Sequence, residues 1–132
     1  MSAIKASGTP ITGTCQLTNA APGPTAFTLQ QVSGGATYTL KPGELVVITH
    51  TAISSNDPAG PLVTVDDGPT AGSYTSRTLA RAYAGSTYPA STIASPVGNV
   101  GRRGVNPRAS TTAVTAAKTV EIVLTGYVTS TT

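Results

Sequence analysis

The sequence of 132 residues is poor in the side chains that build a large hydrophobic core or an active site. It has no Trp, one Phe and one Met, and aromatic residues make up only 5% of the chain. Charged residues make up 10%, with five Asp and Glu and a single His. Because large aromatic side chains supply much of the buried apolar surface in ordinary cores, this chain has to rely on small residues. Association with other chains would supply further burial.

The single cysteine, Cys15, excludes an internal disulfide and a metal site built from several cysteines. We expect it to be a small buried hydrophobic residue. No apolar run approaches the roughly 20 residues that cross a bilayer, and the start MSAIKASG lacks the apolar segment of a signal peptide. The sequence predicts a soluble protein that has no membrane partner and is made without classical export.

Thr and Ser are abundant, and there are 14 Gly and 10 Pro, whereas Lys, Glu and Leu are scarce. β-Branched side chains suit the pleated surface of a sheet and lose rotamer freedom in a helix. Because a chain of this length forms one core more readily than two, we expect a single all-β domain. We place an N-terminal arm at residues 1–13 and an antiparallel β-sandwich domain at residues 14–132.

Short stretches with alternating hydrophobicity are separated by turn sequences about every ten residues, as in sandwiches. Apolar residues at the start of ELVVITHTAI, residues 44–53, indicate a strand covered on both faces. KPGE at 41–44 predicts a type II turn, and SRTLARAY at 76–83 fits a strand or a short helix, of which we favour the strand. The most regular alternation, in KTVEIVLTGYV, predicts a central strand. The other predicted strands lie at residues 15–18, 26–32, 36–40 and 61–66.

Residues 84–112 have weak periodicity and several turn-forming clusters. We therefore expect a long irregular excursion there and not a core element, and its length exceeds that of loops without a function. Its middle, SPVGNVGRRGVNPRAS at residues 95–110, combines Gly and Pro with three arginines.

Residues able to perform chemistry are sparse. His50 lies in a predicted strand and fits a histidine with a satisfied hydrogen bond, and no G-x-S-x-G nucleophile elbow occurs. Asp66 and Asp67 would point to opposite faces of a strand, so a turn at Asp67-Gly68 explains them better than an acid-base pair. GNVGRRG follows no apolar strand and opens no helix, which argues against a phosphate-binding loop. We predict no enzymatic activity, no cofactor and no metal.

All five arginines fall within residues 68–117, a stretch without Asp or Glu. A guanidinium makes forked hydrogen bonds to carboxylates and loses its water more readily than an ammonium. We favour a protein interface anchored by these side chains, and a solvated basic loop is the main alternative. Nucleic acid is less favoured, although Tyr74, Tyr83 and Tyr88 are able to stack on bases. The predicted partner-binding residues are Arg77, Arg81, Arg102, Arg103 and Arg108.

Three segments, residues 45–53, 62–68 and 120–128, together resemble the small jelly-roll or β-sandwich virion proteins of tailed bacteriophages. In that family a strand leads through a polar loop to a second strand that ends in Asp-Gly, and the domain closes on a strand rich in Val and Thr. The resemblance covers about a third of this chain.

The resemblance implies a capsid decoration or cement protein, made in the host cytoplasm and placed on the outer surface of the virion. Such a protein binds the major capsid protein, often as a homotrimer, and performs no covalent chemistry. The Gly/Pro-rich excursion would follow the surface of the partner, with Arg102, Arg103 and Arg108 as anchors. The alternative is a receptor-binding or carbohydrate-binding β-sandwich module of a phage tail or fibre.

Overall fold

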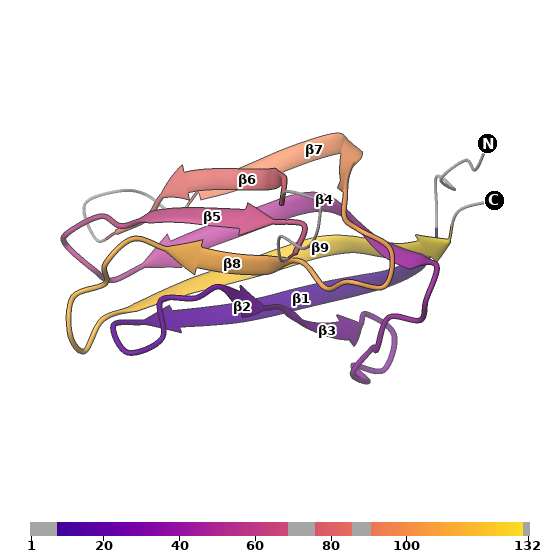
Figure 1. Ribbon diagram of the computed structural model, residues 1–132, viewed down its shortest axis with the longest axis horizontal. Helices are drawn as coiled ribbons and strands as arrows, with labels where there is room; N and C mark the ends of the chain where they lie inside the picture. Colours follow the sequence, from indigo (N-terminus) through magenta and orange to yellow (C-terminus); the bar gives the residue numbers. More distant parts are fainter. Residues whose placement is uncertain (1–7, 69–75, 86–90, 131–132) are drawn as a thin grey trace.

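The computed structural model describes residues 8–68, 76–85 and 91–130, which form nine strands and no helix (Figure 1). This confirms the predicted all-β class. The strands are β1 (Thr9–Thr18), β2 (Thr25–Ala26), β3 (Thr28–Gln31), β4 (Glu44–Ser55), β5 (Leu62–Asp66), β6 (Thr78–Tyr83), β7 (Ser91–Val100), β8 (Arg108–Thr111) and β9 (Thr119–Ser130).

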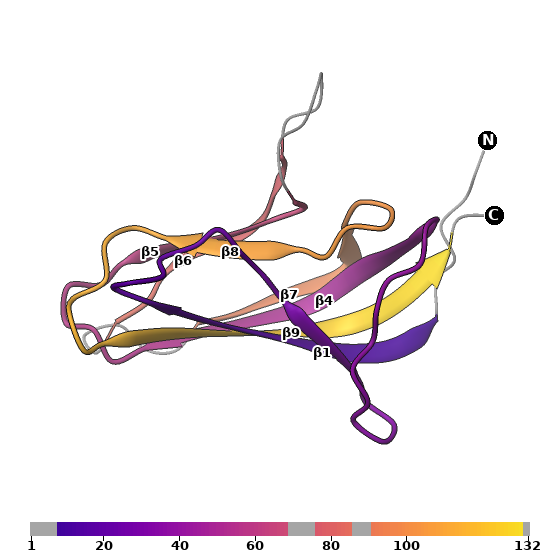
Figure 2. The ribbon, with the colours of Figure 1, turned by 60° about the horizontal axis from the view of Figure 1, so that its bottom comes forward.

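The strands form two antiparallel sheets that lie one over the other (Figure 2). The first sheet has the order β3-β1-β9-β4-β7, and the second has the order β2-β8-β5-β6. Buried apolar side chains from both sheets form one cluster, to which β1 contributes Ile11 and Leu17 and β5 contributes Val63 and Val65. The core therefore lies between the sheets.

Strand pairing is nested along the chain. β1 pairs with β9, β2 with β8, β4 with β7 and β5 with β6, so each pair lies inside the preceding one in the sequence. The pairs β4-β9 and β5-β8 then join them side by side into the two sheets. β3 is added at the outer edge of β1.

The two strands with the strongest sequence signals behave as predicted. β9 lies in the middle of the first sheet, and its buried side chains alternate with exposed ones. Leu45, Val46, Val47 and Ile48 of β4 are consecutive and all buried, which confirms a strand covered on both faces. Residues 41–44 form the predicted turn, in which Glu44 N–H donates to Lys41 O over 3.0 Å and Gly43 has a φ of 87°.

The predicted strand at residues 26–32 is divided between the two sheets. β2 pairs with β8 in the second sheet, β3 pairs with β1 in the first, and Phe27 is buried between them. Phe27 N–H donates to Pro107 O over 2.9 Å. Gly13 on β1 pairs with Leu29, and a Cβ added there would lie 3.1 Å from Leu29 Cδ2 and 3.5 Å from the Phe27 Cβ. The missing side chain at Gly13 therefore leaves room chiefly for Leu29.

Two boundary predictions are wrong. Residues 36–40 form no strand, because only Thr37 makes an isolated bridge, to Gln30. Residues 9–13 of the predicted arm belong to β1, where they pair with β9, while residues 1–7 lie outside the described residues. Residues 78–83 form β6, which confirms the prediction of a strand in preference to a short helix.

The expectation that residues 84–112 contain no core element is also wrong. β7 forms an edge of the first sheet, and β8 lies inside the second between β2 and β5. The pairing of β7 with β4 changes register between Asn99 and Ala94, and this interval contains Pro96 and Gly98. Proline and glycine are tolerated in this way at edge strands and irregular pairings. The irregular part of the excursion that the structure describes is residues 101–107.

Candidate functional site

A buried carboxylate just after β5 gathers two of the predicted arginines. The Asp67 side chain is 1% exposed. Its Oδ1 accepts the backbone N–H of Arg77 over 2.8 Å, and its Oδ2 accepts the Arg77 Nε–H over 3.1 Å. Arg102 approaches from another segment, with its Nη2 3.7 Å from the same Oδ2. One acid thus binds residues 10 and 35 positions further along the chain.

Asp66, the last residue of β5, holds a third arginine. Its Oδ1 accepts the Nε–H of Arg108 over 2.8 Å and the backbone N–H of Gly68 over 2.9 Å. The second contact confirms the predicted turn at this point. The carboxylates of Asp66 and Asp67 bind different arginines, as expected for neighbours at the end of a strand.

The arginine cluster, defined as Arg77, Arg102 and Arg108 with Asp66 and Asp67, joins four elements of the fold. Arg77 Nη2 also donates to Val100 O over 2.7 Å at the end of β7. Together these contacts connect the end of β5, the start of β6, the end of β7 and the start of β8. The cluster therefore fastens the second sheet to the edge of the first.

The structure separates the five predicted partner-binding residues into two groups. Arg77, Arg102 and Arg108 form ion pairs within their own chain, which the sequence did not predict. Arg81 on β6 and Arg103 in the loop after β7 are exposed, and neither takes part in an ion pair with a described residue. The docking role of all five remains a prediction.

The loop at residues 101–107 is fixed along most of its length. Gly101 N–H donates to Val46 O over 2.8 Å, and Gly104 N–H donates to Glu44 O over 2.6 Å. Asn106 Nδ2 donates to Phe27 O over 2.9 Å. Within the Gly/Pro-rich stretch 95–110, the predicted irregular path is limited to residues 101–107, and it is bonded to β4 and to Phe27 of its own chain.

The turn beside this loop carries its own polar contacts. The Glu44 carboxylate accepts the Lys41 backbone N–H over 2.9 Å and the Tyr38 hydroxyl over 2.8 Å. The backbone hydrogen bond from Lys41 is the main cause that lowers the pKa of Glu44. Burial opposes it, and the Tyr38 hydrogen bond and the Lys41 charge lower the pKa further. The hydrogen bond to Glu44 in turn raises the pKa of Tyr38. Sequence reasoning gave no role to Tyr38 or Lys41.

A second buried carboxylate, Asp57, fixes the opposite end of the molecule. It is fully buried and accepts the Thr115 N–H over 2.7 Å, the Thr115 hydroxyl over 2.8 Å and the Ala59 N–H over 2.9 Å. The pKa of Asp57 is lowered, chiefly by the backbone hydrogen bond from Thr115. This carboxylate therefore joins the loop after β4 to the loop before β9.

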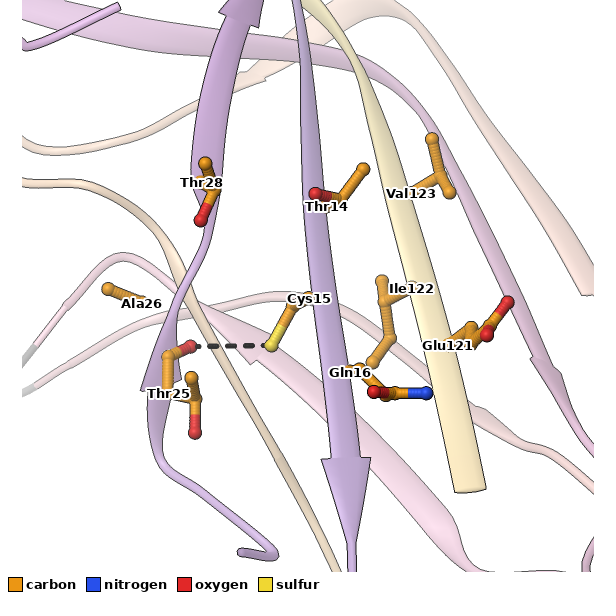
Figure 3. A pocket seen from close by; sticks show the side chains of 9 residues that line it. All are labelled: Thr14, Cys15, Gln16, Thr25, Ala26, Thr28, Glu121, Ile122 and Val123. Atoms are coloured by element: carbon orange, nitrogen blue, oxygen red, sulfur yellow. Dashed lines mark hydrogen bonds between the residues drawn. The ribbon is translucent and has the colours of Figure 1, made fainter. Parts of the chain in front are cut away.

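A hollow of about 460 Å³ lies between β1 and β2, beyond the end of the β1–β3 pairing (Figure 3). Cys15 lines it, with its Sγ 3.7 Å from Thr25 O, and the residue as a whole is 8% exposed. Burial raises the pKa of Cys15, which keeps the thiol protonated and a poor nucleophile. The prediction that Cys15 is a small buried residue is confirmed. The hollow is lined by Thr14, Cys15, Gln16, Thr25, Ala26, Thr28, Glu121, Ile122 and Val123.

The other candidates for chemistry lie apart from one another. His50 is exposed on β4, with its Nδ1 3.3 Å from Thr49 Oγ1. Among the described residues, no three or more His, Cys, Asp or Glu side chains come together as a metal site. Tyr83 is 57% exposed at the end of β6, beside a hollow of about 350 Å³ shared with Leu62, Arg81 and Ala82. Tyr74 and Tyr88, the other suggested stacking residues, lie outside the described residues.

Comparison of the chain with protein-family models and with curated proteins finds no match. In the ranges that the structure describes, no helix is long and apolar enough to span a membrane.

Proposed function

We propose that this chain is a jelly-roll sandwich that acts as a non-enzymatic virion structural protein and binds a bacteriophage capsid lattice. The observation that carries the proposal is the nested pairing of β1 with β9, β2 with β8, β4 with β7 and β5 with β6. A hairpin of eight strands that folds over on itself leaves its strands paired in this way.

The strand order within the sheets supports the same topology. Without β3, the sheets read β1-β9-β4-β7 and β2-β8-β5-β6, four strands each. Two sheets of four strands joined by Greek-key connections make a jelly roll, an architecture common among viral capsid and lectin domains. The added β3 continues the chain from β2 after the crossing at Phe27.

The outer face of the first sheet supports close association with other rigid surfaces. Thr12 lies opposite Thr125, and Thr14 lies opposite Val123, which is 40% exposed. Gln16 lies opposite Glu121, the only acid in these three pairs. Short polar side chains around one apolar residue suit hydrogen-bonded contact between proteins. We propose the major capsid protein as the partner, a homotrimer as the bound form and the outer surface of the capsid as the location, after synthesis in the host cytoplasm.

Light scattering of the purified chain tests the association, at two protein concentrations and two salt concentrations. We expect a stable mass of about three times the 13.1 kDa chain. Co-sedimentation with empty phage shells tests the lattice binding directly. A monomer at both concentrations that also fails to sediment with any shell would overturn the proposal.

A carbohydrate-binding or receptor-binding module is the second candidate, because one observation favours it. The exposed ring of Tyr83 borders a hollow that also contains Arg81, and lectin domains share the jelly-roll architecture. An aromatic ring beside an arginine suits the apolar face and hydroxyl groups of a sugar. This candidate predicts a rise in melting temperature with a glycan that the Tyr83→Ala variant loses. The capsid proposal predicts no such shift.

A further inference from the structure

We infer that two adjacent turns form the surface that meets the partner, and that they bind a carboxylate-rich protein segment. We define this twin-turn surface as residues 41–44 and 102–105. The inference rests on the proposed function and deepens it, because it names which part of the chain makes the contact and the chemistry of what it contacts.

The two turns are fastened to one another although about sixty positions separate them in the sequence. Gly104 N–H donates to Glu44 O over 2.6 Å. A Cβ added at Gly104 would lie 3.8 Å from the Cα of Pro42, so the backbones are close to contact. Each turn is closed by its own hydrogen bond, from Glu44 N–H to Lys41 O and from Val105 N–H to Arg102 O. The surface is therefore one preformed unit.

The charges on this surface leave an excess of positive charge. Lys41 and Arg103 are exposed at the two turns. Arg102 directly precedes Arg103, and the 63% exposed Arg77 shares the Asp67 carboxylate with Arg102. The carboxylate of Glu44 already accepts hydrogen bonds from Tyr38 and from the Lys41 backbone. The buried carboxylate of Asp67 already binds Arg77 and Arg102. Both acids are thus occupied, and Arg103 takes part in no ion pair with a described residue.

The setting of Arg103 reduces the cost of binding. Its backbone lies between Gly101, bonded to Val46, and Gly104, bonded to Glu44. Its neighbour Arg102 is held by Asp67. A loop that is already fixed loses little conformational freedom when it binds, so more of the interaction energy appears as affinity.

The same region indicates a carboxylate as the preferred anion. The chain itself satisfies Arg77 and Arg108 with the carboxylates of Asp67 and Asp66, at 3.1 and 2.8 Å. Nucleic acid binding relies on many phosphate contacts and on aromatic rings that stack on bases. Among the described residues this surface gathers Lys41, Arg77, Arg102 and Arg103, and the hydroxyl of Tyr38, an aromatic residue close to it, is engaged by Glu44. An acidic protein segment fits the surface better than a phosphate backbone.

The test is an NMR titration of the isotope-labelled chain with a short glutamate homopeptide. We expect the largest amide shifts at residues 41–44 and 102–105, and affinity roughly fivefold to tenfold weaker in the double variant Lys41→Glu/Arg103→Glu. The control, Lys118→Glu/Ala113→Glu/Ala116→Glu, changes the net charge equally, because Ala113 and Ala116 are exposed neutral residues that precede β9. Lys118 precedes β9 at the far end of the first sheet, about 35 Å from Glu44 along the strand.

Three results would overturn the inference. These are amide shifts spread over all exposed cations, equal affinity in the Lys41→Glu/Arg103→Glu variant and its matched control, and tighter binding of oligothymidylate than of the glutamate peptide. The amide spectrum of each variant shows whether it has folded. The proposed function fails separately, through the mass and shell experiments on the unaltered chain. Shells that bind the unaltered chain and the Lys41→Glu/Arg103→Glu variant equally would leave the lattice proposal intact and remove the twin-turn surface.

Discussion

Arg77 binds Asp67 twice, through its backbone N–H at 2.8 Å and through its side-chain Nε–H at 3.1 Å. The carboxylate is 1% exposed, whereas the guanidinium side chain is 63% exposed. The Asp67 carboxylate is thus the buried partner, and the Arg77 side chain covers it. This relationship fixes the start of β6 against the end of β5, and the first prediction follows from it.

The Asp67→Asn variant should be less stable than the natural chain by about 1–2 kcal/mol. The amide cannot provide the charged acceptors that Arg77 and Arg102 use, and solvent around the exposed guanidinium groups limits the loss. Urea unfolding followed by circular dichroism measures the change. Glu121→Gln, at an exposed acid that makes no ion pair with a described residue, is the control and should leave the midpoint unchanged. Equal midpoints for the two variants would contradict this account of the cluster.

Asp57 should make stability depend on acid pH. Because the folded state lowers its pKa, this carboxylate stabilises the fold above its ordinary value of about 3.8, and the contribution is lost as the pH falls through the lower folded pKa. Asp57→Asn should therefore lower the melting temperature at neutral pH, since the amide faces the N–H and hydroxyl donors of Thr115 with one acceptor fewer.

Melting temperatures of the natural chain and of Asp57→Asn, measured from neutral to strongly acidic pH, check this prediction. The two curves should converge as the medium becomes more acidic, because the natural carboxyl is then protonated as well. A constant gap at every pH would show that Asp57 acts through its shape alone. Glu44, whose pKa is also lowered, remains in both chains and accounts for the acid sensitivity they share.

Gly126→Ala should be among the most destabilising substitutions in the first sheet. A Cβ at Gly126 would overlap the carbonyl oxygen of Val47, where the pairing of β4 with β9 changes register. Backbone cannot move aside as a side chain can, so we expect a loss at or above the upper end of the roughly 1–3 kcal/mol typical of overpacking.

Gly13→Ala provides the comparison for Gly126→Ala. Its closest contact would be the Leu29 Cδ2 at 3.1 Å, the end of a flexible side chain. The midpoint of denaturant unfolding should therefore fall less for Gly13→Ala than for Gly126→Ala. A larger fall in the midpoint for Gly13→Ala would mean that the backbone near Ile48, where the pairing changes register, can shift to accommodate the added Cβ at Gly126.

The Cys15 thiol should react with a disulfide reagent at least about tenfold more slowly in the folded chain than in urea. Burial raises its pKa, and the residue as a whole is 8% exposed, so both the thiolate fraction and access are low. Absorbance with an aromatic disulfide at neutral pH measures the two rates. Rapid reaction in the folded state would mean that the hollow beside β2 opens more widely than the structure shows.

The parts of the fold that could be predicted are those where hydrophobic alternation is strong. β9 has regularly alternating apolar residues, which predict its central position in the sheet. β4 begins with continuous apolar residues, which predict a strand covered on both faces. The turn at residues 41–44 follows from Pro and Gly at the positions that the turn type requires. Local signals of this kind do not depend on partners far away in the chain.

β7 and β8 could not be predicted for a related reason. β7 contains Pro96 and Gly98 and lies at a sheet edge, where the pairing that overrides local propensity comes entirely from β4. β8 has only four residues, with Ala109 as its fully buried side chain, which is too short for a period to be recognised. In both strands the composition indicates a loop, but pairing with other strands determines the structure.

The sequence contains a signal for the arginine cluster but does not identify the partners of the arginines. Asp66 and Asp67 lie just outside the basic stretch of residues 68–117. These two acids nevertheless neutralise much of the positive charge of that stretch. Strand order was required to see this, because β8 pairs with β5 and thereby brings Arg108 next to Asp66. The approach of Lys41 to Arg103 depends on the same three-dimensional information.

The central position of β9 also affects when the chain is able to fold. A ribosome makes β1 and β4 long before β9, yet both pair with β9 and not with one another. During synthesis the first sheet therefore lacks its middle strand, and β1 and β4 present unpaired edges until residues 119–130 have emerged. Such edges are prone to aggregation, so a chain stalled before β9 should require chaperones that the finished chain does not.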